Sequence, residues 1–183
     1  YPIYRKEALE DIIKYFKNDL ILSTTGKSSR ELLESMKDLG LSQDNIFLNV
    51  GAMGHVSMIA LGVAMNTPKR VICIDGDGSV IMHMGNLTNI GTSNCSNLIH
   101  IVLNNGMHES VGIQPTNAYN INLSNIAKNC GYCYSKVIDT KESLLESLDE
   151  ISNNSYTGPV FLEIRINNKV NYQHELTRPT DIL

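Results

Sequence analysis

Two kinds of apolar spacing alternate along this sequence, and the alternation limits the fold more than any other feature. Between residues 7 and 16, apolar side chains recur at the spacing of a buried helix face. The short apolar run Leu20–Ser23 follows, which is typical of a buried strand. The pattern predicts strands at residues 20–23, 45–50, 71–74, 98–103, 134–138 and 160–164. It predicts helices at residues 7–16, from Ser28 and Ser29 as N-cap up to Gly40, and at 54–65, 84–92, 123–129 and 141–151.

The predicted strands indicate the fold class. Residues 71–74 and 98–103 are apolar at nearly every position, as in a parallel sheet that helices cover on both faces. We therefore expect an α/β fold, a three-layer sandwich with a mostly parallel sheet of about six strands. A chain of 183 residues with 42% hydrophobic residues suits one domain, residues 1–183. Because the first residue is Tyr1 rather than Met, we expect this domain to be a fragment or one subunit of a larger protein.

Composition excludes several classes of partner. The net charge is −4, and the 15 Lys and Arg residues are scattered, so no basic stripe is available for nucleic acid. The apolar runs are far shorter than the roughly 20 residues that cross a membrane, so we expect no membrane association. The four cysteines do not form the pattern of a disulfide framework, which favours a reducing, cytoplasmic location.

Polar residues follow two neighbouring predicted strands. Gly76-Asp77-Gly78 comes after the strand at 71–74, and Asn104-Asn105 ends the strand at 98–103. The carboxyl ends of consecutive parallel strands can lie side by side, which would bring Asp77 and Asn105 to one ion. Mg²⁺ prefers such oxygen ligands, often together with substrate phosphates. The irregular segment 104–120 is also long for a connection and lies at this ligand-binding edge.

The spacing of Gly-Asp-Gly and Asn-Asn resembles the signature of thiamine diphosphate enzymes. The resemblance implies thiamine diphosphate and Mg²⁺ as cofactors, with Asp77, Asn105 and the Met107 carbonyl as metal ligands. It also implies that Gly76, Gly78 and Ser79 contact the diphosphate. The stretch Gly51-Ala52-Met53-Gly54 is similar to the one that holds the bent cofactor, with Met53 as its apolar support and the Gly51 carbonyl as an acceptor. The loop with Thr25 and Gly26 resembles the one that approaches the diphosphate.

Within this family, the sequence most resembles phosphonopyruvate decarboxylases, and next the β subunits of sulfopyruvate decarboxylases. The matching stretches are Ser23–Leu32, Gly76–Gly85, Leu103–Thr116 and Arg178–Thr180. The resemblance implies a carbon-carbon lyase that decarboxylates the 2-oxo acid phosphonopyruvate to phosphonoacetaldehyde, with sulfopyruvate as the alternative substrate. It places His108 beside the substrate as the candidate catalytic residue.

The resemblance covers only half of such an enzyme. No glutamate of the chain has the context of the one that activates the cofactor's pyrimidine. We therefore expect a partner, either a pyrimidine-binding domain or a separate subunit, in a homo- or hetero-oligomer, and no activity without it. A cofactor-binding module that is inactive without such a partner is the alternative.

Other motifs carry competing interpretations. A dinucleotide site would need a third glycine where Ile81 stands. Cys130-Gly131-Tyr132-Cys133 has the spacing of a redox motif, but it follows a predicted helix, so we expect ordinary small residues near the core. His55 and His83 are weaker candidates than His108 for contact with substrate. Lys27 and Arg30 are candidate anion ligands or solvated charges at a helix start.

Overall fold

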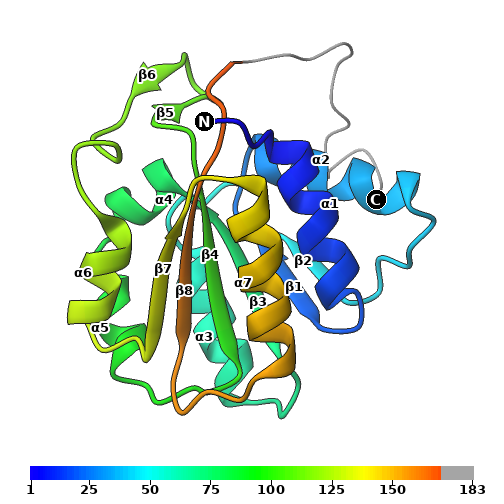
Figure 1. Ribbon diagram of the computed structural model, residues 1–183, viewed down its shortest axis with the longest axis vertical. Helices are drawn as coiled ribbons and strands as arrows, with labels where there is room; N and C mark the ends of the chain where they lie inside the picture. Colours follow the sequence, from blue (N-terminus) through cyan, green and yellow to red (C-terminus); the bar gives the residue numbers. More distant parts are fainter. Residues whose placement is uncertain (170–183) are drawn as a thin grey trace.

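The computed structural model describes residues 1–169, and its centre is a six-stranded sheet of parallel strands in the order β2-β1-β3-β4-β8-β7 (Figure 1). The strands are β1 (Leu20–Ser23), β2 (Ile46–Leu48), β3 (Val71–Gly76), β4 (Leu98–Asn104), β7 (Tyr134–Ile138) and β8 (Val160–Arg165). The two-residue strands β5 (Met107–His108) and β6 (Gln114–Pro115) form a separate antiparallel pair. The predicted α/β class and the six predicted strands are confirmed.

Helices cover both faces of the sheet. On one face lie α1 (Arg5–Phe16), α2 (Lys27–Asp38) and α7 (Lys141–Asn153), which share one apolar cluster with the strands. On the other lie α3 (Val56–Met65), α5 (Asn86–Gly91) and α6 (Leu123–Asn129), which share a second cluster. The short helix α4 (Asp77–Met82) begins directly after β3. The three predicted layers are therefore present.

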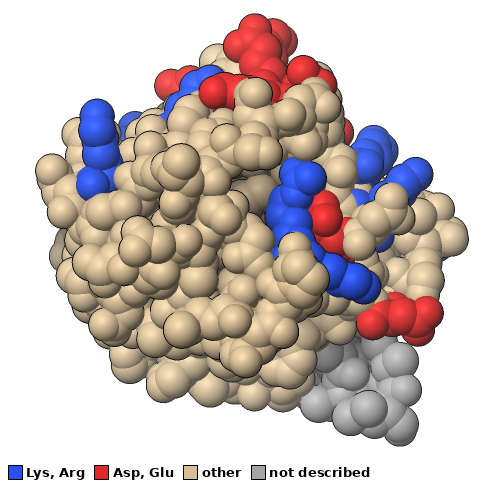
Figure 2. Space-filling model, turned by 90° about the horizontal axis from the view of Figure 1, so that it is seen from below, with Lys and Arg blue, Asp and Glu red and all other residues tan. Residues whose placement is uncertain are grey.

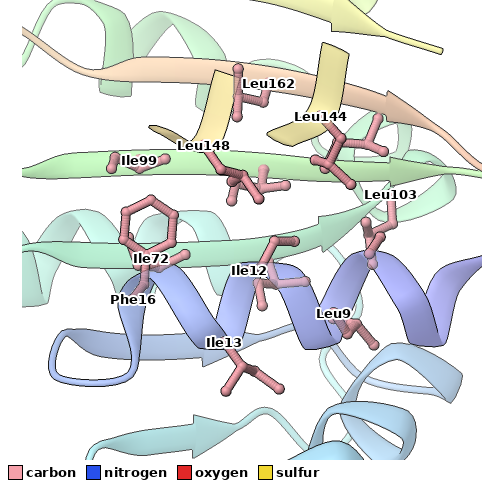
Figure 3. Packing of buried hydrophobic residues seen from close by; sticks show 14 of the residues in the cluster. Leu9, Ile12, Ile13, Phe16, Ile72, Ile99, Leu103, Leu144, Leu148 and Leu162 are labelled. Atoms are coloured by element: carbon pink, nitrogen blue, oxygen red, sulfur yellow. The ribbon is translucent and has the colours of Figure 1, made fainter. Parts of the chain in front are cut away.

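The central strand β4 explains why the sheet needs both layers. All seven of its residues are buried. Ile99, Ile101 and Leu103 belong to the cluster under α1 and α7, whereas Leu98 and Val102 belong to the cluster under α3 and α6. Successive side chains of a strand point to opposite faces, so an uninterrupted apolar run has to be covered twice. Figure 3 shows the first cluster, with side chains of α1, α7 and the strands packed together.

The strand order places a crevice at one edge of the sheet. From β1 the chain goes to β2 on one side, and then crosses to β3 on the other side of β1. In open α/β sheets, ligands bind beyond the carboxyl ends of the strands where the order reverses in this way. The β5–β6 pair lies beyond these same ends, at the top of Figure 1. We therefore expect the loops after β1, β3 and β4 to form the ligand-binding site.

The start of α2 differs from the sequence-based expectation. Gly26, with φ +99°, is the N-cap, and Ser28 and Ser29 lie inside the helix. The prediction that these serines cap the helix is therefore wrong. The Ser29 hydroxyl instead donates to the Thr24 carbonyl at 2.5 Å, so it fastens the β1–α2 loop. Gly40 has φ +64° just past the end of α2, as expected for the residue that terminates a helix.

One end of the molecule shows how its charges are distributed. Figure 2 shows the end of the molecule opposite the β5–β6 pair, where Lys and Arg form separate groups beside acidic residues and most of the surface is uncharged. No helix among residues 1–169 is long and apolar enough to cross a bilayer. All four cysteines are free thiols. Cys133 is exposed, so the expectation that it lies near the core is wrong.

Two leucines of α7 provide a test of this packing. Leu148 is fully buried in the first cluster, whereas Leu145 on the same helix is 38% exposed. We expect Leu148→Ala to lower the free energy of unfolding by about 2–5 kcal/mol, because it leaves a cavity in the core. Leu145→Ala should lower it by less than about 1 kcal/mol. Urea unfolding followed by circular dichroism measures both, and equal losses would contradict the assigned orientation of α7.

Candidate active site

A recess of about 60 Å³ lies at the carboxyl ends of β1, β3 and β4. It is lined by Arg5, Thr24, Thr25, Lys27, Ser28, Met53, Gly76, Asp77, Gly78, Ser79, Leu103, Asn105, Met107, His108, Glu109, Ser110 and Ile166. Since neighbouring parallel strands pair Ser23 with Ile74 and Gly76 with Leu103, the loops that follow them emerge side by side. Residues distant in sequence therefore meet in one recess.

The turn from β3 into α4 supplies a buried carboxylate. Asp77 is the first residue of α4 and is only 2% exposed. Burial raises the pKa of Asp77, while hydrogen bonds from Thr116 and from the backbone amides of Asn105 and Gly78 oppose the rise. Thr116 donates its hydroxyl proton to Asp77 Oδ2. A divalent cation would stabilise the ionised carboxylate further.

The turn after β4 holds the two asparagines in different roles. Asn104 is fully buried, and its Nδ2 donates to Glu163 Oε1 at 2.9 Å while its Oδ1 accepts from the Gly106 amide at 3.0 Å. Asn105 lines the recess, and its Oδ1 accepts from the Met107 amide at 3.2 Å. Asn104 thus stabilises the turn, while Asn105 and Asp77 line the same recess.

Ser79 links three loops beneath the recess. Its hydroxyl accepts from the Gly54 amide at 3.0 Å and from the Thr24 hydroxyl at 3.2 Å. A second connection joins the loop after β1 to the turn at residues 49–55: the Gly51 amide donates to Thr25 Oγ1 at 3.2 Å. Gly51 and Gly54 have positive φ angles of 73° and 89°, a conformation that glycine adopts readily. This turn carries the Met53 side chain to the recess.

His108 packs directly on the glycine after Asp77. A Cβ atom at Gly78 would lie 2.4 Å from His108 Cε1, so the imidazole leaves room only for glycine. His55 and His83 instead contact each other, with ring centroids 4.6 Å apart, and neither lines the recess. Of the three histidine candidates, the structure therefore brings only His108 to the recess.

The structure places the sequence-predicted site residues closely together. Those that line the recess are Thr25, Met53, Gly76, Asp77, Gly78, Ser79, Asn105, Met107 and His108. Gly26 and Gly51 lie in the adjoining loops without lining it. Lys27 lines it and Arg30 does not. The stretch Arg178–Thr180 lies outside the described residues.

Sequence reasoning missed three residues of the site. Arg5 and Glu109 line the recess and form an ion pair, and Thr116 holds Asp77. Glu109 could have been singled out from the sequence by the scarcity of charged residues around it. Between residues 45 and 127, the Lys, Arg, Asp and Glu residues are only Lys69, Arg70, Asp75, Asp77 and Glu109. An acidic residue in so uncharged a stretch is a candidate for a specific role, whereas nothing local in the sequence distinguishes Arg5.

A buried polar chain lies below the Gly-Asp-Gly turn. Asp75 Oδ1 accepts from the Gly76 amide at 2.8 Å, and Asp75 Oδ2 lies 3.5 Å from His100 Nε2. His100 Nδ1 is 3.0 Å from the Tyr132 hydroxyl. Tyr132 is thus a buried member of this hydrogen-bonded series of side chains. The Cys130–Cys133 stretch, which contains Tyr132, follows α6 and leads into β7. That order is the reverse of the strand-then-helix context of a redox motif.

The fold and the recess define an α/β protein with a carboxylate, an amide and a glycine-rich turn at its topological switch point. Two solved structures share the fold: the thiamine diphosphate-dependent 4-hydroxybenzoylformate decarboxylase of Rhodococcus jostii RHA1 and the benzoylformate decarboxylase of Polynucleobacter necessarius. The first has a TM-score of 0.74 at 19% identity, covering 91% of this chain and 33% of that one. The second has a TM-score of 0.71 at 16% identity, covering 93% and 34%.

The family model "Thiamine pyrophosphate enzyme, C-terminal TPP binding domain" matches residues 36–164. The chain belongs to this family, which confirms the resemblance found in the sequence. It is 39% identical over 164 residues to the phosphonopyruvate decarboxylase of Streptomyces viridochromogenes, covering 88% of this chain and 39% of that protein. It is 39% identical over 151 residues to the sulfopyruvate decarboxylase subunit beta of Methanocaldococcus jannaschii, covering 78% and 74%. The chain thus spans well under half of the first relative.

The contact between His108 and Gly78 provides a test of the recess geometry. We expect Gly78→Ala to lower the free energy of unfolding by about 1–3 kcal/mol, because the new methyl group overlaps the imidazole. Adding His108→Ala should recover most of that loss, giving a coupling energy in a double-mutant cycle. Gly85→Ala is the control, since nothing lies within 4 Å of a Cβ there. Additive losses in the double variant would show that the two residues do not touch.

Proposed function

We propose that this chain is the diphosphate- and Mg²⁺-binding half of a thiamine diphosphate-dependent decarboxylase of 2-oxo acids. The observation that carries the proposal is that Asp77 and Asn105 line one recess at the carboxyl ends of the neighbouring strands β3 and β4. There the buried carboxylate of Asp77 accepts a hydrogen bond from the Thr116 hydroxyl. Membership in the thiamine pyrophosphate enzyme family supports the same assignment.

The residues present fit the cofactor's metal and diphosphate. Asp77 and Asn105 offer side-chain oxygens and Met107 a carbonyl, which is the hard donor set that Mg²⁺ prefers. Gly76 and Gly78 line the recess; at Gly76 nothing lies within 4 Å of a Cβ position, so an anionic group can approach the backbone there, whereas at Gly78 the His108 imidazole occupies that space. Ser79 completes the contact with the diphosphate. Thr25, Gly26, Gly51 and Met53 form the remaining wall and its supporting loops.

The protein's own part in the reaction is binding and orientation. When bound, thiamine diphosphate supplies the electron sink that decarboxylation of a 2-oxo acid needs. Asp77 and Asn105 would hold the metal, Met53 would support the cofactor with its apolar side chain, and the Gly51 carbonyl would accept from the cofactor's amino group. His108, beside Gly78, binds the anionic substrate or transfers a proton near neutral pH.

We further propose phosphonopyruvate as the substrate and phosphonoacetaldehyde as the product. The relatives named phosphonopyruvate decarboxylase, from Streptomyces viridochromogenes and Streptomyces hygroscopicus, support this choice at 39% and 43% identity. Sulfopyruvate is the alternative, because the Methanocaldococcus jannaschii sulfopyruvate decarboxylase subunit beta is also 39% identical. Such an enzyme works in phosphonate biosynthesis, and the free thiols suit the reducing cytoplasm.

The proposal includes a partner that completes the site. The chain matches a family model described as a C-terminal binding domain and covers 39% of the Streptomyces viridochromogenes relative, which supports a second domain or subunit at the site. A pyrimidine-binding domain or subunit would enclose the rest of the cofactor in a homo- or hetero-oligomer. The name "subunit beta" of the Methanocaldococcus jannaschii relative supports an assembly of this kind. The alternative is a cofactor-binding module without turnover of its own.

An assay of the complete assembly tests the proposed function. We expect the chain with a complementing pyrimidine-binding domain to release carbon dioxide from phosphonopyruvate faster than from sulfopyruvate, and the chain alone to release none. Faster release from sulfopyruvate would show that sulfopyruvate, rather than phosphonopyruvate, is the substrate. Cofactor binding without turnover of either acid would favour the module.

Removal of the buried carboxylate tests the metal site. We expect Asp77→Ala to abolish Mg²⁺-dependent binding of thiamine diphosphate, because the metal loses its anionic ligand. Isothermal titration calorimetry on the assembly, with and without EDTA, measures the loss. Asp139→Ala is the matched control, since Asp139 is exposed and lies outside the recess. Undiminished binding by the Asp77 variant would refute the assignment of the metal ligands.

A further inference from the structure

We propose that Glu109, held in place by Arg5, is a positioning residue that fixes the orientation of the Asn105 carboxamide for metal binding. This inference rests on the proposed function, because it concerns the metal site assigned there. It adds two residues to that site, one of them from a helix that the sequence motifs do not include.

The contacts place Glu109 behind Asn105. Asn105 Nδ2 donates to Glu109 Oε2 at 3.1 Å. The same carboxylate oxygen accepts from the guanidinium of Arg5, at the start of α1. The side chain of Glu109 is 7% exposed and that of Arg5 is 11% exposed. All three residues line the recess.

The hydrogen-bonding capacity of Glu109 decides the orientation of the Asn105 carboxamide. An ionised carboxylate can only accept hydrogen bonds, so Glu109 binds the NH₂ end of Asn105 and rejects its oxygen. The oxygen end is held in turn by the Met107 amide at 3.2 Å. An amide oxygen has a second acceptor site, which stays available for a cation. If the carboxamide turned over, it would present an NH₂ group, which cannot ligate a metal.

Arg5 compensates the negative charge of the buried Glu109 carboxylate. A carboxylate removed from water is costly unless it is paired and hydrogen-bonded, and Glu109 has both kinds of partner. Arg5 also lies 3.9 Å from Glu31 of α2. The guanidinium therefore joins α1, α2 and the loop after β4. Groups that orient a metal ligand from behind commonly change metal affinity about 10- to 100-fold when they are removed.

The test is Mn²⁺ affinity rather than turnover. Mn²⁺ replaces Mg²⁺ as a spectroscopic probe, and electron paramagnetic resonance reports the free ion in an assembly with equal thiamine diphosphate in every sample. We expect Glu109→Gln to weaken Mn²⁺ binding at least about tenfold. Glutamine has nearly the same size, but it offers both a donor and an acceptor, so it no longer rejects the flipped carboxamide, and the Met107 amide alone then favours the oxygen end.

Two further variants separate orientation from stability. Glu31→Gln alters another acidic neighbour of Arg5 and leaves the Asn105 contact intact, so its Mn²⁺ affinity should stay within about twofold of wild type. The double variant Arg5→Met/Glu109→Gln leaves no unpaired guanidinium, and it should show the same weakening as Glu109→Gln. Thermal unfolding of each variant confirms that the fold is retained.

The outcomes distinguish this inference from the proposed function. Wild-type Mn²⁺ affinity in both Glu109 variants would overturn the positioning role and leave the metal site standing. If Glu31→Gln weakened Mn²⁺ binding as much as Glu109→Gln does, the positioning role would also be overturned. The loss of affinity would then come from weaker packing between α1 and α2 rather than from the orientation of Asn105. Failure of the wild-type assembly to bind Mn²⁺ with thiamine diphosphate would reject the proposed function itself.

Discussion

The parallel pairing of β1, β3 and β4 is the constraint on which the rest of the molecule depends. These strands are covered on both faces, and β4 has no exposed residue. Side chains along a doubly covered strand are mostly apolar, with buried exceptions such as His100, so the polar groups that can meet a ligand lie where the strand ends. Because the strands run in the same direction, three loops emerge at one edge. The recess is the direct consequence of that geometry.

The recess concentrates charge in a part of the chain that is otherwise nearly uncharged. Asp75 and Asp77 are both almost fully buried, and Glu109 is nearly so. Buried carboxylates destabilise a fold unless hydrogen bonds, cations or metals compensate them. Asp77 has Thr116 and backbone amides, and Glu109 has Arg5 and Asn105. In the proposed enzyme, the metal supplies the remaining positive charge.

The division of labour between folding and function follows from the same layout. The two apolar clusters lie on either side of the sheet, and Leu103 and Ile166 of the first cluster also reach the recess. Stability therefore comes from the covered faces, while the edge can keep an open, polar and incomplete site. A second domain or subunit can add its half at that edge without changing the core.

The sequence by itself determined the six strands of the large sheet, the helices other than α4 and the main motif residues, because these depend on local periodicity and on residues a few positions apart. It correctly placed Asp77 and Asn105 after neighbouring strands. Only the tertiary structure decided what surrounds them. Arg5 reaches Glu109 across 104 positions, Thr116 returns to Asp77 across 39, and His108 packs on Gly78. Such contacts depend on how α1 docks and how the loop after β4 folds back, and no local pattern encodes either. For the same reason the N-cap of α2 was misjudged, since the Ser29 hydroxyl is used by a loop contact that forms only in the folded chain.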